Sequence, residues 1–385
     1  MDRRRWLTLT GAGLTLSLLP RSSPGADPKA AADPKLWEAT VDKAIAFLRK
    51  TQTSEGDDRG SWSATKSPGC TGIILTGLLE TDKITSKDPM AEKALKYIEG
   101  LINPKNGHIA GREDPRPQLL NYVTSVNVMA LQAANRSDLY GKVVKNAAGF
   151  LKKLQWDDAN GKDAKDDFYG GAGYDSKSRP DLSNTQIFLD ALKAAGVPQN
   201  DPAYKKAMIF VSRCQNLKGE HNDQPWAGKI NDGSFIYSAA AGGQTKVETE
   251  DGSLAGYGSM TYAGIKSLIY CGASKDDPRI VKAMEWIRKN YSVDRNPGMP
   301  DARKERGLYY YYHTMAKCLD AMGVDVVETP DGKKHAWRQE LVEKLAKLQQ
   351  SNGSWTNTVD QWMEGDPNLV TGYVLMALSH CKPKK

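Results

Sequence analysis

Residues 44–52 read AIAFLRKTQ and are followed by Gly60-Ser61-Trp62, and this pattern returns along the chain. Its elements are an alanine, an aromatic residue three positions later, an aliphatic residue next, and a glutamine eight positions after the alanine. The later copies are anchored at Ala94, Ala147, Ala207, Ala283 and Leu341. Six copies of one unit predict a repeat architecture in which each unit packs against its neighbours.

Each copy reads as an amphipathic helix, a glycine-rich turn that ends in an aromatic residue, and a second helix of small and apolar residues. The second helices are expected at 71–79, 123–134, 185–195, 260–270, 314–322 and 369–378. They are nearly free of charge, which predicts burial on most sides. Ala130, Leu192, Ala263 and Ala377 are therefore expected in the interior.

The glutamine and the Gly-Ser-Trp turn have a structural interpretation. A glutamine side chain can donate to and accept from exposed backbone groups near a helix start, and glycine supplies a positive φ. Gln52, Gln155, Gln215 and Gln349 keep this position. We therefore predict a brace for the turn rather than a catalytic group.

This Gln/Trp repeat resembles that of the prenyltransferase and squalene-cyclase repeat superfamily, over residues 36–381. The resemblance implies an all-α fold, an α/α toroid of six helix pairs. In this family the inner helices run parallel to one another, the outer helices run antiparallel to them, and the ring encloses an apolar cavity. Residues 33–385 are accordingly expected to form a single toroid domain of six repeats.

Residues 1–32 have the pattern of an export signal. Arg3, Arg4 and Arg5 precede Trp6 and Leu7, a short apolar run follows, and alanines at 30–32 offer a cleavage site. The Arg-Arg-x-aromatic-Leu order resembles a twin-arginine signal. A plain secretory signal and a retained N-terminal anchor are the alternatives. We expect an exported protein of the periplasm or cell envelope.

Composition excludes several classes of protein. Of the 385 residues, 39% are hydrophobic and 26% are charged, as in globular rather than disordered proteins. The mean hydropathy is −0.56, and no long apolar run after the N-terminus predicts a membrane span. A dispersed net charge of +7 does not indicate nucleic-acid binding. The five cysteines are expected as buried free thiols, with one disulfide left open.

Known catalytic motifs of the family are missing or incomplete. The Asp-x-Asp-Asp acid motif of its alkene-protonating cyclases does not occur. Tyr312-His313-Thr314 matches the histidine ligand of zinc-dependent prenyltransferases, but Tyr257-Gly258-Ser259 stands where Asp-Gly-Cys is needed. Zinc requires at least three protein ligands in a catalytic site. We predict no metal and no cofactor, and keep His313 and Tyr312 as catalytic candidates.

Tyr309-Tyr310-Tyr311-Tyr312 is the other unusual feature, because four consecutive aromatic residues cannot share one face of a helix. Tyrosine faces can stabilise a carbocation or line a lipid pocket, and packing between inner helices is the alternative. The cavity residues we expect are Tyr262, Tyr309, Tyr311, Tyr312, His313, Tyr373, Asn121 and Asn184. His313 has a second interpretation as a satisfied histidine at a helix start. Asp181 and Asp366 stand at capping distance from their helices.

Three functions follow from these observations. The first is an exported terpene-cyclase-like or prenyltransferase-like toroid that binds or transforms an isoprenoid-type lipid or another apolar small molecule. The second is a non-catalytic toroid that binds a polypeptide or scaffolds an envelope assembly. The third, a zinc-dependent prenyltransferase, is least supported by the residues present. The sequence alone does not decide whether the protein is an enzyme, nor its oligomeric state.

Overall fold

The structure is a computed structural model that describes residues 31–111 and 119–383. In this part of the chain helices dominate, and the only strands are the short hairpin β1 (Val327–Glu328) and β2 (Lys334–His335). The predicted export signal lies almost entirely outside the described residues. No described helix is both long and apolar enough to cross a membrane. The predicted all-α fold is confirmed.

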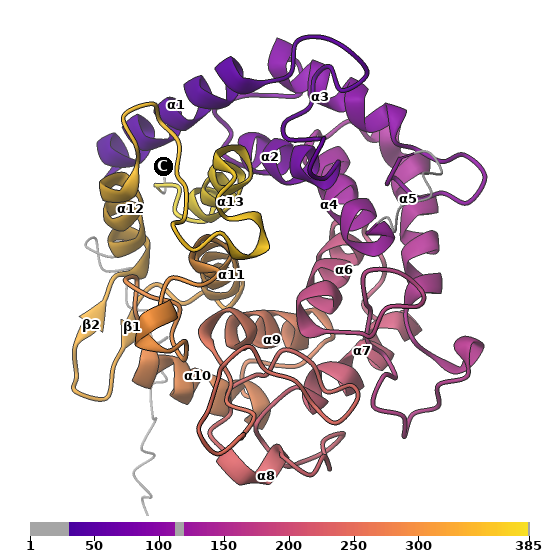
Figure 1. The fold of residues 1–385 in the computed structure, drawn as a ribbon, viewed down its shortest axis with the longest axis vertical. Coiled ribbons are helices and arrows are strands. Elements are labelled where there is room, and N and C mark those ends of the chain that lie inside the picture. Colours follow the sequence, from indigo (N-terminus) through magenta and orange to yellow (C-terminus); the bar gives the residue numbers. More distant parts are fainter. Residues whose placement is uncertain (1–30, 112–118, 384–385) are drawn as a thin grey trace, which may run out of the picture.

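The helices form two concentric rings (Figure 1). The outer ring consists of α1 (Pro34–Thr51), α3 (Pro89–Gly100), α5 (Ser137–Leu154), α7 (Pro202–Arg213), α10 (Pro278–Asn290) and α12 (Trp337–Leu348). The inner ring consists of α2 (Gly69–Glu80), α4 (Leu120–Ala133), α6 (Leu182–Ala194), α9 (Gly258–Tyr270), α11 (Leu308–Ala321) and α13 (Pro367–Ser379). Each inner helix packs against the next, and α13 packs against α2, so the inner ring is closed. A four-residue helix, α8 (Ala227–Ile230), and three short 3₁₀ turns lie in those connections that the structure describes.

The inner helices are buried on nearly all sides, as their composition predicts. Ala130, Leu192, Ala263 and Ala377 have no exposed surface. Small residues allow close contact here, because a Cβ added at Gly77 would lie 2.8 Å from the carbonyl oxygen of Gly372. All five cysteines are free thiols, and four of them are buried.

The recurring turn of the repeat braces one pair of helices to the next. The Gln52 side chain donates to the carbonyl oxygens of Gly60, in its own turn, and of Met90, in the next outer helix, at 2.9 and 2.8 Å. Gln155 and Gln215 make the same two kinds of bond in their repeats. Gln349 donates at 3.0 Å to the carbonyl oxygen of Thr40 in α1, so the last brace closes the ring. The predicted structural role of these glutamines is confirmed.

Glycine is required in this turn for a close approach. Gly60 and Gly353 have φ values of +91° and +92°, which disfavour other residues. A Cβ at either position would lie 2.3 Å from a carbonyl oxygen of the next outer helix. The tryptophan that follows, Trp62 or Trp355, donates its indole N–H at 2.8 Å to a carbonyl near the end of the preceding outer helix.

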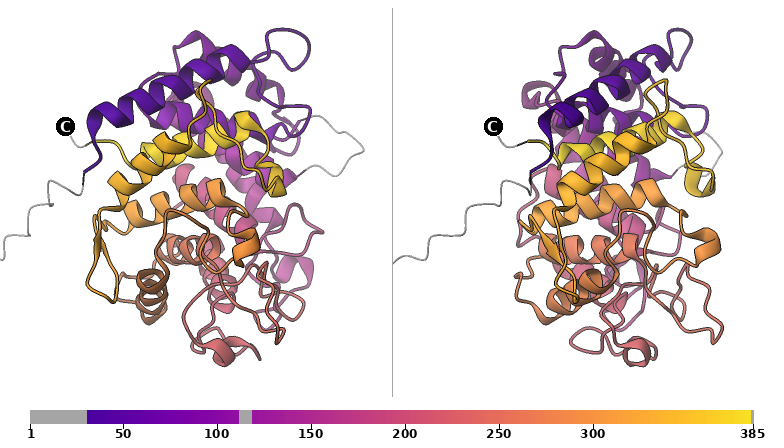
Figure 2. Two further views of the ribbon diagram at one scale, coloured as in Figure 1. Left: turned by 60° about the vertical axis from the view of Figure 1, so that its left-hand side comes forward. Right: turned by 90° about the vertical axis from the view of Figure 1, so that its left-hand side faces the viewer.

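The parallel inner helices place their N-terminal ends at one face of the ring. The long connections that lead into them gather at this face, while the start of α1 and the end of α13 lie at the opposite one (Figure 2). Aspartates cap two of these helix starts, as expected. Asp181 accepts from the backbone N–H of Asn184 at 2.8 Å, and Asp366 accepts from that of Asn368 at 2.9 Å. Any site built at this face lies among six helix N-termini.

Candidate active site

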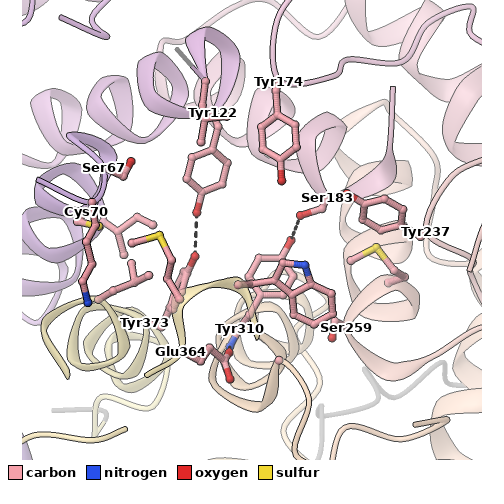
Figure 3. A pocket seen from close by; sticks show the side chains of 18 of the residues that line it. Ser67, Cys70, Tyr122, Tyr174, Ser183, Tyr237, Ser259, Tyr310, Glu364 and Tyr373 are labelled. Atoms are coloured by element: carbon pink, nitrogen blue, oxygen red, sulfur yellow. Dashed lines mark hydrogen bonds between the residues drawn. The ribbon is translucent and has the colours of Figure 1, made fainter. Parts of the chain in front are cut away.

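A cavity of about 210 Å³ lies at the N-terminal ends of the inner helices (Figure 3). All six inner helices or the connections leading into them contribute to its wall. The lining residues are Lys66, Ser67, Cys70, Ile73, Leu119, Tyr122, Tyr174, Ser183, Tyr237, Tyr257, Ser259, Met260, Gly307, Tyr310, Trp362, Met363, Glu364, Leu369 and Tyr373. Apolar and aromatic side chains predominate, and a few polar groups interrupt them, which is the usual form of a small-molecule site.

Three tyrosine hydroxyl groups at the wall have hydrogen-bond partners within the protein. The hydroxyls of Tyr122 and Tyr373 are 2.8 Å apart, and that of Tyr310 lies 2.9 Å from Ser183 Oγ. Gln186 also donates to the Tyr310 hydroxyl, at 2.7 Å. Tyr310 and Tyr373 meet edge to face with their ring centroids 5.9 Å apart. Since the hydroxyls are paired, these side chains present mainly aromatic surface to a ligand.

Glu364 supplies a carboxyl group to the cavity wall. It is 1% exposed. Its Oε1 accepts from the backbone N–H of Tyr310 at 2.8 Å, and its Oε2 accepts from the Asn357 amide at 2.6 Å. Burial raises the pKa of Glu364 to about 7, although these hydrogen bonds act in the opposite direction. A carboxyl group with a pKa near 7 is suited to donate or accept a proton at neutral pH.

A second carboxyl group lies behind the opposite wall. Burial raises the pKa of Asp181 to about 6, while hydrogen bonds from Asn184 and Tyr237 and the charge of Lys246 oppose the shift. Tyr237 lines the cavity and so connects Asp181 to it. The site therefore has two buried acids with raised pKa values, one on each side of an aromatic space.

Trp362 and Met363 cover part of the cavity. Both have left-handed backbone conformations, with φ values of +58° and +65°, which cost free energy in residues of this size. The Trp362 side chain remains 42% exposed. Gly307, on the facing segment, leaves room for it, since a Cβ there would lie 3.0 Å from the indole ring. The hydrogen bonds of Glu364 hold this strained segment against the start of α11.

The tyrosines predicted for the cavity are placed in different ways. Tyr373 lines the cavity. Tyr309 donates to the Thr356 carbonyl at 3.4 Å, and Tyr311 and Tyr312 donate at 2.7 Å to the carbonyls of Ser292 and Val293. Tyr262 packs against the ring of Tyr311, with 5.8 Å between ring centroids. None of these four is in the cavity wall. Successive residues of a helix point about 100° apart, so Tyr309, Tyr311 and Tyr312 do not share the direction of Tyr310. Only Tyr310 of the four-tyrosine run faces the ligand space.

His313 lies below the cavity, not in its wall. It is 1% exposed and stacks on Tyr373, with 6.1 Å between ring centroids. Burial, and then the charges of Lys317 and Lys266, hold its pKa well below the usual value, so the imidazole is neutral. Neither ring nitrogen has a hydrogen-bond partner within the described structure. No group of three or more potential metal ligands occurs among the residues described.

The two predicted asparagines organise the backbone around the site. Asn121 donates at 2.8 Å to the Gly173 carbonyl, which fixes the connection into α6. Asn184 donates at 2.8 Å to Asp181. Both are buried, and neither lines the cavity. They position the elements from which Tyr174 and Asp181 extend.

Three charged side chains meet deeper in the ring, on α6, α9 and α11. Asp190 Oδ2 lies 2.5 Å from Lys266 Nζ, and Asp190 Oδ1 lies 3.0 Å from Lys317 Nζ. The Asp190 and Lys266 side chains have no exposed surface. From the sequence, these helices are expected to be nearly free of charge, and contact among the three charged groups is not predicted.

The arrangement of the helices in paired rings is found in other solved structures. The chain aligns with an apo structure of a variant of the type II terpene cyclase MstE from Scytonema over 90% of its length and 97% of the other chain, with 14% identity and a TM-score of 0.55. The chain has the fold of the terpenoid cyclases. A second MstE variant, in complex with geranylgeranyl dihydroxybenzoate, aligns over 90% and 98% of the two chains with 13% identity and a TM-score of 0.56. No protein-family model and no curated protein sequence matches the chain.

Within this terpenoid cyclase fold, the sequence lacks the Asp-x-Asp-Asp motif, and Glu364 is the carboxyl group that the structure places in the cavity wall. Sequence reasoning missed Glu364, which stands two residues before the capping residue Asp366. An acidic residue just ahead of a capped inner helix was the available signal. The sequence does not show that this residue reaches the cavity. Glu364 precedes α13 along the chain, but its side chain bonds to the start of the neighbouring helix α11.

Proposed function

We propose that the protein is a terpene-cyclase-like enzyme that binds an isoprenoid-type lipid in the aromatic cavity and transforms it by proton transfer from Glu364. The observation that carries this proposal is a buried carboxyl group, with a pKa raised to about 7, in the wall of an apolar cavity lined by tyrosines. The fold shared with MstE supports it. The MstE structures include one with geranylgeranyl dihydroxybenzoate and one with the product merosterolic acid A.

The proposed chemistry balances without a cofactor. Protonated Glu364 donates a proton to an alkene carbon or to the oxygen of an epoxide, and the adjacent carbon becomes cationic. Another double bond of the lipid attacks this cation, which forms a carbon–carbon bond and moves the charge along the chain. Aromatic faces stabilise such a passing cation. Loss of a proton from a neighbouring carbon ends the reaction, so the product is an isomer of the substrate.

Lipid binding is tested with a pair of neighbouring tyrosines. Tyr310→Ala removes a ring from the cavity wall, whereas Tyr309→Ala removes one that points to Thr356. We expect saturable binding of geranylgeraniol, followed by tryptophan fluorescence, to weaken at least tenfold in Tyr310→Ala and to change little in Tyr309→Ala. An absence of saturable lipid binding would refute the proposal and favour the polypeptide-binding or scaffold role.

Catalysis is tested by isotope incorporation. In deuterated buffer, a polyprene or its terminal epoxide should be converted to an isomer, and protonation of an alkene carbon should add one deuterium, detected by mass spectrometry. Glu364→Gln keeps the size of the side chain and removes the acid, so conversion should stop while lipid binding persists. Glu328→Gln, an exposed carboxylate on β1, is the control. Unchanged turnover in Glu364→Gln would exclude this residue as the proton donor.

We also propose that residues 1–32 direct export of the folded protein to the periplasm or cell envelope. The support is the Arg3-Arg4-Arg5-Trp6-Leu7 order ahead of a short apolar run. Replacing Arg3 and Arg4 by lysine should retain the protein in the cytoplasmic fraction. Unchanged export of this variant would indicate a plain secretory signal, and export of the cleaved chain would be visible as a shorter N-terminus.

A further inference from the structure

An unpaired lysine stands at the edge of the cavity. The ammonium group of Lys246 lies 4.1 Å from the centre of the Tyr237 ring, and Tyr237 belongs to the cavity wall. Lys246 belongs to none of the ion pairs among the described residues, whereas nearby Arg303 pairs with Glu248 at 2.5 Å. Lys246 is also partly buried. A cation that is held partly out of water without a counter-ion is costly unless something compensates it.

Further positive charge surrounds Lys246. Burial lowers the pKa of Lys246, and the charges of Arg179 and Arg306 act in the same direction, against the effect of Asp181. Arg306 donates at 3.0 Å to the Lys246 carbonyl, so the two residues are held together. Asp181, the acid that faces this group, lies behind Tyr237 and is itself buried. Glu248 is the exposed acid here: it pairs with Arg303 at 2.5 Å and lies 3.9 Å from Arg306, so Lys246 is left without an ion pair of its own among the described residues.

Arg306 adds an independent observation. It is only 8% exposed, and its Nε is buried without a hydrogen-bond partner in the described structure. The next residue, Gly307, lines the cavity. The other two nitrogens of this guanidinium have protein partners, the Lys246 carbonyl and, at 3.9 Å, Glu248, so Nε is its one buried donor without a partner among the described residues; such donors normally bond to protein, water or ligand. Lys246 and Arg306 thus form a basic edge, with Arg179 nearby, at the Tyr237 and Tyr257 side of the cavity.

We propose that this basic edge binds an anionic head group, a carboxylate or a phosphate, of the lipid whose apolar chain occupies the aromatic cavity. The inference rests on the proposed function and defines its substrate class as an acidic isoprenoid amphiphile. Positive side chains near Tyr237 destabilise a carbocation formed beside them. The reacting double bonds are therefore expected on the Glu364 side of the cavity. The head group supplies the direct ion-pair partner that Lys246 lacks among the described residues, and guanidinium and ammonium groups are the usual partners of carboxylate and phosphate.

Three ligands that share one isoprenoid chain but differ in head group separate the contribution of the chain to binding from that of the head group. Geranylgeraniol, geranylgeranoic acid and geranylgeranyl monophosphate should all bind, and at least one of the two anions should bind tenfold or more tightly than the alcohol at low ionic strength. Lys246→Gln should remove most of that preference and leave the affinity for the alcohol unchanged. Lys229→Gln, an exposed lysine on α8, should change nothing. Circular dichroism and the melting temperature show whether each variant is folded.

The outcomes separate the head-group inference from the proposed function. If the alcohol binds and neither anion binds better, the cavity takes a lipid but the head-group inference is wrong. If Lys246→Gln weakens all three ligands equally, Lys246 acts on the cavity wall and not on the anion, which also overturns it. If none of the three binds saturably, the proposed function itself fails. A preference for only one anion identifies the head group as carboxylate or phosphate.

Discussion

Replacing Asp190 by asparagine should destabilise the ring strongly. Asp190 is the only carboxylate that pairs with Lys266 and Lys317 among the described residues, and Lys266 has no exposed surface. Asparagine keeps the shape but removes the charge, so two ammonium groups remain in the interior without their counter-ion. Removing one partner of a buried ion pair costs about 3–5 kcal/mol. Because the Lys317 side chain is 13% exposed, we expect the lower part of this range.

The assay is thermal and urea unfolding at pH 7. A loss of about 3–5 kcal/mol corresponds to a fall in melting temperature of about 4–7 °C for a ring of this length, from an unfolding entropy of about 2 cal/mol/K per residue. The pH dependence gives a second check. Burial already lowers the pKa of Lys266 to about 8, and the charge of Asp190 opposes this shift. Without Asp190 the lysine should lose its proton more easily, so the destabilisation should shrink as the pH rises from 7 to 9.

A triple variant distinguishes a charge effect from a packing effect. Asp190→Leu combined with Lys266→Met and Lys317→Met replaces all three charges by apolar groups of similar size. Such replacements of buried ion pairs are often neutral or stabilising. We expect the triple variant to be at least as stable as Asp190→Asn. A loss below about 1 kcal/mol in Asp190→Asn, or a triple variant that is less stable than it, would show that the cluster is not a buried ionic unit.

Three further predictions concern Glu364, the segment over the cavity and the ring closure. Because burial raises the folded-state pKa of Glu364 from 4.5 to about 7, the wild type should lose up to about 3 kcal/mol of stability as the pH rises from 4.5 through 7, and urea titrations should show this loss disappear in Glu364→Gln. Trp362→Ala should increase the dissociation rate of a bound lipid in stopped-flow measurements, and Gly307→Ala should cost about 1–2 kcal/mol, since it strains a residue at φ +63°. Gln349→Leu should cost about 1–3 kcal/mol in chemical unfolding, because it removes both hydrogen bonds of the brace and the Gly353 carbonyl loses its side-chain partner, while Gln350→Leu, at an exposed position where the side chain bonds the hydroxyls of Thr356 and Ser354, should cost less than about 1 kcal/mol.

The fold could be predicted from the sequence because its signals are local and repeated. Gln52 and its three counterparts sit at the same place in their four units, and their hydrogen bonds reach only the same turn and the next outer helix. The apolar composition of the inner helices identifies them without knowledge of their neighbours. Recognising the helix pair in one repeat therefore predicts the helix pairs of the other repeats.

The cavity could be predicted only in outline. That Tyr310 faces the ligand, and not Tyr311 or Tyr312, depends on the rotation of α11 about its axis, which is set by packing against the rest of the ring. The same limit applies to charge. Asp190 and Lys266 are isolated in two sequence segments 76 residues apart, and only the contact between α6 and α9 makes them a pair.

The position of the acids explains how this cavity can have titratable groups without an Asp-x-Asp-Asp motif. Six inner helices bring their N-termini to one face, and each N-terminus needs hydrogen-bond acceptors for its free N–H groups. Asp366 meets this need beside Lys66, 2.9 Å away, and the ion pair contributes to lowering its pKa. Glu364 meets it in the apolar wall and Asp181 meets it behind Tyr237, and in both places the loss of hydration outweighs the helix N–H groups and raises the pKa. The same helix-capping requirement thus yields a carboxylate with a lowered pKa where an ion pair forms, and carboxyl groups with raised pKa values where burial dominates.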